Sequence, residues 1–241
     1  MLTERQKKIL EVIIKEYTET GEPVGSAILD KKYSLGVSPA TIRNEMVRLK
    51  KEGYLAQPHA SAGRIPTPMA FRFYIKELMK EKELSVAEEV AVKERVWDYR
   101  FEPEKFLREI TKALAEKTKA LALAATKEGD LYHAGYANVL DIPEFYDIDV
   151  TKTVFSLLEE VDQLQRLFAK SFGEEPVHVL IGSELGIQLL EPCSMIFADF
   201  EAGPKLRGNL GVIGPYRFDF SYVIPVIRYF ASLLEEIGRS W

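Results

Sequence analysis

Four polar side chains recur at helical spacing in residues 40–51 and could together contact nucleic-acid bases. Thr41, Asn44, Arg48 and Lys51 are three or four positions apart, so an α-helix would carry them on one face. Asparagine can bond both edge atoms of adenine and arginine both edge atoms of guanine, while threonine can contact a thymine methyl and lysine neutralises phosphate. Any surface helix presents a polar face, so the neighbouring elements must show whether this face binds nucleic acid or is only solvated.

The helix that would carry this face has a start signal and a stop signal. Ser38 is a favourable N-cap, and Pro39 suits the first helical position, where a backbone N–H has no partner. The helix is expected to run to about Glu52 and to stop at Gly53. At 100° per residue its apolar side lies opposite the polar face and consists of Ile42, Met46 and Leu49.

Two predicted helices precede this one. The first covers residues 4–20 and begins with a capping box between Thr3 and Gln6. A shorter helix over 26–33, capped by Ser26, and a glycine-containing turn then lead to the third helix. Helix, short helix, turn and capped helix in this order indicate a helix-turn-helix.

The residues after the third helix predict a hairpin, the wing. Strands are expected over 54–57 and 63–65, with a loop at 58–62 between them. Thr67 would cap a further helix. The buried side of that helix is expected to carry Phe71, Tyr74, Ile75 and Leu78. With this hairpin the helix-turn-helix becomes a winged one.

The outer face of the third helix and the wing supply the candidate DNA contacts. Ser61, Gly63 and Arg64 offer donors to a phosphate or the minor groove. His59 suits a backbone or phosphate contact better than a metal, because no second ligand stands at metal spacing. The predicted set is Ser38, Ala40, Thr41, Arg43, Asn44, Arg48, Lys51, His59, Ser61, Gly63 and Arg64.

The charge is distributed unevenly along the 241 residues. Residues 1–82 hold 15 Lys+Arg and 10 Asp+Glu, whereas residues 83–241 hold 17 and 27. A basic head on an acidic body is expected when the head binds a polyanion. The sequence has one cysteine, no signal peptide and no long apolar run, which predicts a cytoplasmic protein without a membrane segment. Catalytic, metal-site and phosphate-loop motifs are lacking, so we expect neither an enzyme nor a cofactor.

Strands and helices alternate irregularly in the rest of the chain, which predicts an α+β fold. Helices are expected over 85–98, 104–122, 151–171 and 221–237. Strands are expected over 121–125, 131–134, 177–181, 194–198 and 206–213, with hairpin turns at 127–130 and 201–204. Glycines 208, 211 and 214 are expected to mark close backbone packing or a bulge. The predicted domains are residues 1–82, a helical linker at 83–102, and residues 103–241.

Several motifs at these positions resemble the HrcA family of heat-inducible repressors. They are residues 23–26, 36–44, 53–55, 57–59 and 61–67, and further along residues 143–145 and 211–215 with Arg217. The resemblance implies a dimeric repressor that binds an inverted-repeat operator ahead of chaperone genes, with the chaperonin as a partner. It also implies a GAF-like second domain with an inserted dimerisation segment.

This chain is shorter than the family pattern. The join from Thr126 to Leu131 comes where the family pattern has a long segment, so we expect the dimerisation segment to be absent and the dimer to use another surface. The helical region 83–119 is the expected surface, whereas the last helix is expected to pack inside its own chain. The apolar positions expected in the interface are Val86, Val90, Val96, Phe106, Ile110 and Leu114.

Two other classes of function remain open from the sequence. The chain could be a regulator of another regulon that senses a small ligand through its second domain. The winged helix could instead bind RNA or dock onto a protein. Binding tests with duplex DNA, duplex RNA and single strands would separate these classes.

Overall fold

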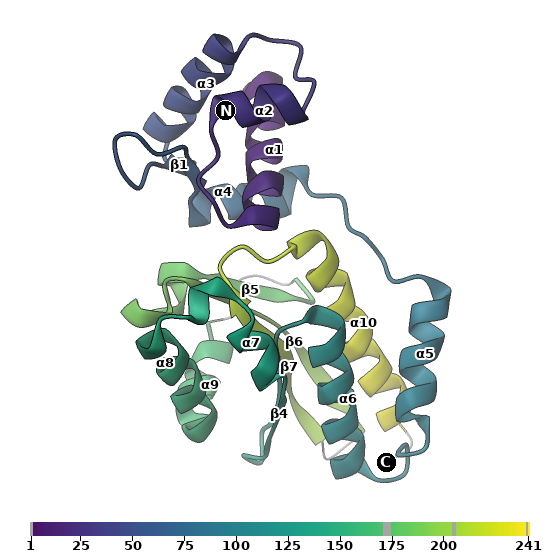
Figure 1. Cartoon of the computed structure of the whole chain (residues 1–241). Coiled ribbons are helices and arrows are strands. Elements are labelled where there is room, and N and C mark those ends of the chain that lie inside the picture. The colour runs from purple at the N-terminus through teal and green to yellow at the C-terminus, as the bar shows by residue number, and fades with distance from the viewer. Residues whose placement is uncertain (1, 171–174, 204–205, 240) are drawn as a thin grey trace. The chain divides into compact units, whose positions relative to one another are not determined.

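The computed structural model describes residues 2–170, 175–203, 206–239 and 241 and divides into two units. The first unit is Met1–Lys80 and the second is Glu81–Trp241 (Figure 1). Each unit has its own buried core. The α+β fold expected from the sequence is confirmed, with a five-stranded sheet in the second unit.

The first unit is built from helices and one short hairpin. Its elements in chain order are α1 (Glu4–Thr20), α2 (Ser26–Lys32), α3 (Pro39–Lys51), β1 (Leu55–Ala56), β2 (Ile65–Pro66), α4 (Pro68–Phe73) and a π-helical turn (Tyr74–Leu78). The capping box at Thr3 and Gln6 is present, and Gly21 ends α1 at φ 71°. The expected cap of α2 is wrong: Gly25 takes the N-cap position and Ser26 is the first helical residue.

The hairpin and the helix after it differ in detail from the expectation. The returning strand starts later, at Ile65, because the Arg64 backbone pairs with Val24 instead, through two hydrogen bonds of 2.9 Å. Thr67 does cap α4, and Phe71 is buried. The other three residues expected on the buried side are only half-buried, because a π-helical turn rotates them away from a regular helical face: Tyr74, Ile75 and Leu78.

The second unit is organised around an antiparallel sheet in the order β4-β3-β7-β6-β5. Its strands are β3 (Leu121–Thr126), β4 (Leu131–Ala134), β5 (His178–Ile181), β6 (Cys193–Ala202) and β7 (Leu206–Pro215). Its helices are α5 (Val86–Trp97), α6 (Pro103–Thr118), α7 (Tyr136–Leu140), α8 (Ile148–Glu159), α9 (Val161–Phe168) and α10 (Phe220–Gly238). Single 3-10 turns lie at Pro143–Phe145, Gly182–Leu185 and Gln188–Leu190.

Helices cover both faces of this sheet (Figure 1). Alternate side chains of a strand point to opposite faces, and in β3, β5 and most of β6 and β7 both sets are buried. One face, which includes Leu123 and Phe197, forms an apolar cluster with α8 and α9. The other face packs against α6 and α10. The apolar stripe of α10 is buried inside its own chain, as expected.

The helix expected over 151–171 is wrong as a single element. Two helices, α8 and α9, meet at Glu160, whose non-helical backbone (φ −114°, ψ 77°) interrupts the helical hydrogen bonds. The expected end at residue 171 lies outside the described residues. The expected turn over 201–204 begins later because β6 runs to Ala202, and residue 204 also lies outside the described residues.

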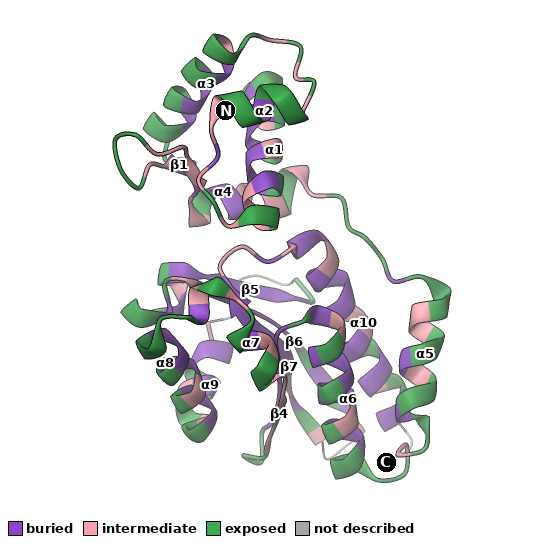
Figure 2. Ribbon diagram, in the orientation of Figure 1, coloured by how far each residue is buried: buried purple, intermediate pink, exposed green. Residues whose placement is uncertain are grey.

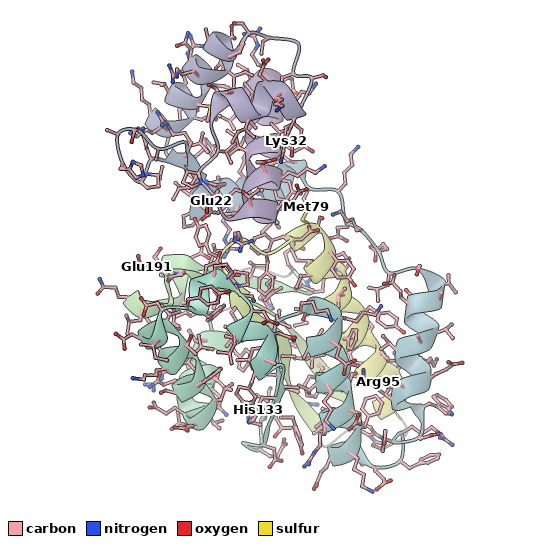
Figure 3. All side chains as sticks on the ribbon, viewed as in Figure 1. Glu22, Lys32, Met79, Arg95, His133 and Glu191 are labelled. Carbon is pink, nitrogen blue, oxygen red and sulfur yellow. The ribbon has the colours of Figure 1, made fainter. Side chains whose placement is uncertain are left out.

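Residues 83–102, expected to be a linker, are packed into the second unit. Arg95, labelled in Figure 3, lies on α5. It forms a two-bond ion pair with Glu116 on α6, at 2.5 and 2.9 Å. On the same helix, Lys93 pairs with Glu236 of α10 at 2.8 Å. The pairing with Arg95 holds the pKa of Glu116 below its usual value.

Most of the apolar residues expected in a dimer interface are instead buried within the chain. Val96, Phe106, Ile110 and Leu114 are fully buried because α5 and α6 turn these sides toward the unit's own core. Val86 and Val90 are exposed. Among the described residues, none of the helices is both long enough and apolar enough to cross a bilayer.

Candidate nucleic-acid interface

α3 is held in place by its cap and by its apolar side. The Ser38 hydroxyl accepts a hydrogen bond from the Thr41 N–H at 3.2 Å, and Pro39 occupies the first helical position. The apolar side is buried and packs on α1; it consists of Ile42, Met46 and Leu49. These contacts fix the rotation of α3 about its axis. The opposite face is therefore turned to solvent.

The exposed face of α3 carries most of the predicted contact residues (Figure 2). The exposed members are Ser38, Ala40, Arg43, Asn44, Arg48 and Lys51. Thr41 is half-buried, and its hydroxyl lies 3.0 Å from that of Ser38, so part of its bonding capacity is used at the helix start. Val47 is also exposed and, like Ala40, offers this face an apolar side chain suited to a thymine methyl.

Arg48 is not free on this face. Its Nη1 lies 3.3 Å from Oε1 of Glu45, a residue that the sequence analysis missed. Glu45 is buried, because it stands about 60° from Ile42 around the helix axis and so lies toward the core. A helical wheel that included charged residues would have found it.

The wing is tied to the end of α3 by a side chain that the sequence analysis also missed. The Gln57 amide nitrogen donates to the carbonyls of Ala60 and Ala62, at 2.8 and 3.1 Å. The Lys50 ammonium donates to the Gln57 amide oxygen at 3.1 Å. The loop between β1 and β2 therefore has a defined position relative to α3. The signal in the sequence was a glutamine directly after a short strand.

Three of the four wing candidates carry polar side chains, and these fall into two groups. His59 and Ser61 are exposed, and their side chains lie 3.1 Å apart, from His59 Nδ1 to Ser61 Oγ. The half-buried Arg64 turns its guanidinium back to donate to the carbonyls of Ala62 and Gly63, at 3.2 and 3.3 Å. His59 and Ser61 are therefore the wing side chains best placed to contact a ligand, whereas Arg64 mainly shapes the loop.

Gly63 has a structural role at the base of the wing. A Cβ atom at this position would lie 2.5 Å from the carbonyl oxygen of Val24. We expect Gly63→Ala to destabilise the first unit by about 1–3 kcal/mol, because the methyl group must push two backbone segments apart. Urea unfolding measures this loss. Gly25→Ala is the control, since its methyl group meets nothing within 4 Å; equal losses for both variants would disprove the explanation.

In the second unit, residues from two of the sequence motifs meet. Arg217 and Glu144 form a largely buried ion pair with bonds of 2.6 and 3.2 Å. Gly208 and Gly211 lie against neighbouring strands, where a Cβ atom would come within 2.0 and 2.4 Å of a carbonyl oxygen. The expectation of close backbone packing at these glycines is confirmed. Burial raises the pKa of the Cys193 thiol to about 12, so this thiol is protonated near neutral pH.

One pocket of the second unit has both polar and apolar walls. It measures about 470 Å³ and is lined in part by Thr126, Lys127, Gln165, Asp199 and Asn209. The Asn209 amide donates to the Asp199 carboxylate at 2.5 Å. Among the described residues no group of three or more His, Cys, Asp or Glu side chains could hold a metal ion.

One solved structure has a fold similar to that of this chain. A crystal structure described as that of a hypothetical protein matches all of this chain and 99% of its own, with a TM-score of 0.79. The sequences are 20% identical, so this match concerns the fold alone.

Comparison of sequences identifies the relatives. A heat-inducible transcription repressor HrcA from Symbiobacterium thermophilum is 27% identical over 339 aligned positions, which cover 99% of each chain. The same repressor from Pelotomaculum thermopropionicum is 28% identical, covering 98% of this chain and 97% of its own. The family model described as HrcA protein C terminal domain matches residues 69–224, well over half of the sequence. The chain belongs to the HrcA family.

Proposed function

We propose that this chain is a DNA-binding transcription repressor of heat-shock genes. The observation that carries the proposal is the outer face of α3, where the exposed side chains of Asn44, Arg48 and Lys51 lie opposite a buried apolar side. A capped helix with such a face, followed by a hairpin tied to its end, suits insertion into the major groove as a winged helix. The names of the relatives support the same function.

The charge distribution supports DNA binding by the first unit and a different function for the second. The basic excess of residues 1–82 attracts phosphate, whereas the acidic excess of residues 83–241 is repelled by it. In this proposal the first unit makes all contacts with DNA. The second unit, which we regard as GAF-like, serves association and regulation, with the chaperonin as its regulatory partner.

We propose further that the repressor is a homodimer that binds an inverted repeat, since a two-fold site is read by two copies. The alignment with the relative from Symbiobacterium thermophilum is longer than this chain, which supports the absence of an inserted segment here. The surface that we assign to the dimer is the exposed apolar stripe of α5 and the turn after it. The stripe consists of Val86 (75% exposed), Val90 (48%), Trp97 (44%) and Phe101 (69%).

A second candidate function rests on the pocket near Asp199. Its lysine, glutamine and asparagine side chains could bind a small polar molecule, and the chain would then be a ligand-sensing regulator of another regulon. A screen for small molecules that raise the unfolding temperature of the intact chain tests this alternative.

The proposed function is tested by the class of nucleic acid that the intact chain binds. We expect the chain to bind duplex DNA and to enrich one sequence, the selected duplex, from a randomised pool. Duplex RNA and single strands of the same sequence should bind more weakly, because an A-form major groove is too narrow for α3. Equal binding to RNA, or no enrichment, would contradict the proposal.

A further inference from the structure

The helix that we propose to bind DNA, α3, carries a buried carboxylate. The Glu45 side chain is 8% exposed, and its Oε1 atom lies near the guanidinium groups of two arginines. Its Oε2 atom is buried and has no hydrogen-bond partner. An unpartnered carboxylate oxygen is costly to bury, and a negative charge beside the groove-facing surface opposes phosphate. Packing alone therefore does not explain why position 45 is a glutamate.

The two arginines approach Glu45 from different helices. Arg48, on the next turn of α3, reaches Oε1 at 3.3 Å with a hydrogen bond. Arg5, from the first turn of α1, has its Nη1 atom 3.8 Å from the same oxygen. Both arginine side chains are more than half exposed, so each can change rotamer without disturbing the core.

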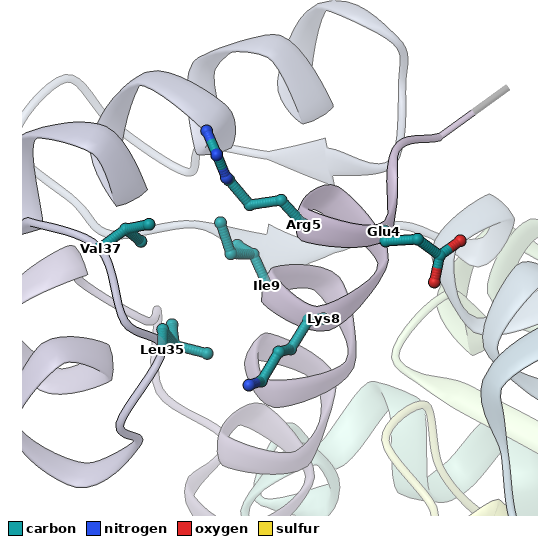
Figure 4. A pocket seen from close by; sticks show the side chains of 6 residues that line it. All are labelled: Glu4, Arg5, Lys8, Ile9, Leu35 and Val37. Atoms are coloured by element: carbon teal, nitrogen blue, oxygen red, sulfur yellow. The ribbon is translucent and has the colours of Figure 1, made fainter.

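Arg5 has space beside it. Its side chain lines a pocket of about 250 Å³ between α1 and the turn before α3, together with Lys8, Ile9, Leu35 and Val37 (Figure 4). The only carboxylate of that lining, Glu4, points away from Val37 in Figure 4. Arg5 therefore pairs with Glu45 and borders open space, so its side chain can move.

We propose that Glu45 is a positioning residue for Arg48, and that Arg5 is the counter-ion that remains with Glu45 when Arg48 turns to DNA. In the free chain Glu45 holds Arg48 along α3. When Arg48 reaches a base or a phosphate, Arg5 closes on the vacated carboxylate and its unpartnered Oε2. The inference rests on the proposed function and deepens it, because it names what controls the availability of Arg48.

The exchange makes the free energy of DNA binding depend on Arg5 only while Glu45 is present. Without Arg5, the departure of Arg48 would leave Glu45 as an unpaired buried charge, and the cost would be subtracted from the binding free energy. Without Glu45, Arg48 is free from the start, and Arg5 has no carboxylate to neutralise. The effects of changing Arg5 and Glu45 are therefore coupled. An Arg5 that contacted phosphate directly would show no such coupling.

The experiment is a double-mutant cycle on the full chain, with affinities measured for the selected duplex and for a shuffled duplex. Arg5→Gln is expected to lower the affinity for the selected duplex about tenfold, which is 1.4 kcal/mol. In a Glu45→Gln background the same change should cost less than about twofold. Glu45→Gln alone should strengthen binding to the shuffled duplex and reduce discrimination, because Arg48 is released to contact any phosphate.

The control is Lys8→Gln, which removes one charge from the same face of α1 and the same pocket. In the described part of the chain the ion pairs of Glu45 are with Arg5 and Arg48, not with Lys8. The small loss of affinity that Lys8→Gln causes should be equal in the wild-type and Glu45→Gln backgrounds. A tenfold loss for Arg5→Gln that persists in the Glu45→Gln background would overturn the inference and assign Arg5 to phosphate. Circular dichroism melting checks that each variant is folded. A wild type that fails to discriminate between the two duplexes would refute the proposed function itself, which is a separate outcome.

Discussion

Asn44→Ala is expected to lower the affinity for the selected duplex by roughly five- to 150-fold, because a bidentate base contact contributes about 1–3 kcal/mol of discrimination. Asn44 lies at the centre of the exposed face of α3, and Arg48→Ala should act in the same direction. The affinity for a shuffled duplex should change much less. Fluorescence anisotropy titrations with both duplexes measure the two losses.

Lys51→Ala is the control for this prediction. Lys51 lies at the end of α3, is exposed, and is suited to a phosphate rather than to a base. Its loss should weaken binding to all duplexes alike and reduce the salt dependence by about one unit. If Asn44→Ala behaved in the same way as Lys51→Ala, Asn44 would contact only the DNA backbone.

Val90→Asp is expected to convert a homodimer into a folded monomer. Val90 lies in the middle of the exposed stripe of α5, while the buried side of that helix holds the unit together. A carboxylate in an apolar interface would lose its water, and the two-fold axis would bring a second one close. Sedimentation velocity measures the assembly, and circular dichroism measures the fold.

Leu189→Asp is the matched control, because Leu189 is 47% exposed and lies on a 3-10 turn away from α5. It should remain dimeric. A monomeric wild type, or a dimeric Val90→Asp chain, would refute the assignment of α5. Val96→Asp is not informative, since Val96 is fully buried and the variant is expected to unfold the second unit.

Much of the first unit could be predicted because its local signals agree. The capping residues Thr3, Ser38 and Thr67 stand at the starts of three helices, and each cap forms the expected hydrogen bond. The periodicity of α3 identified its buried apolar residues and most of its exposed ones, but it missed the burial of Glu45 and the half-burial of Thr41. These features depend on neighbours within one turn of helix, so the sequence alone reveals them.

Other features depend on contacts between distant residues. The pairing of Arg64 with Val24, which shifts the wing strand, joins segments about forty positions apart, and no local rule signals it. The break between α8 and α9 at Glu160 has no proline or glycine to mark it. The apolar positions of α5 and α6 had the spacing of an interface, but the same spacing serves an internal core.

Among the predicted contact residues, some properties likewise follow from local signals and others from contacts that the sequence does not show. Exposure of Asn44 follows from the helix period, whereas the hydrogen bonds that the Arg64 side chain makes to its own loop do not. The ion pair between Arg48 and Glu45 required a charged residue on the core side, which a count of apolar positions overlooks. Thus the face could be predicted, but the state of each side chain on it could not.

The measurement that tests the central claim most directly is the ratio of two affinities of the intact chain at one salt concentration. One duplex is the selected duplex, and the other has the same base composition in shuffled order. We expect a ratio of about 10³ or more, because a repressor that reads base edges through α3 should discriminate strongly between the two duplexes. A ratio near one would show binding through phosphates alone and would contradict the assignment of this face as a sequence-reading surface.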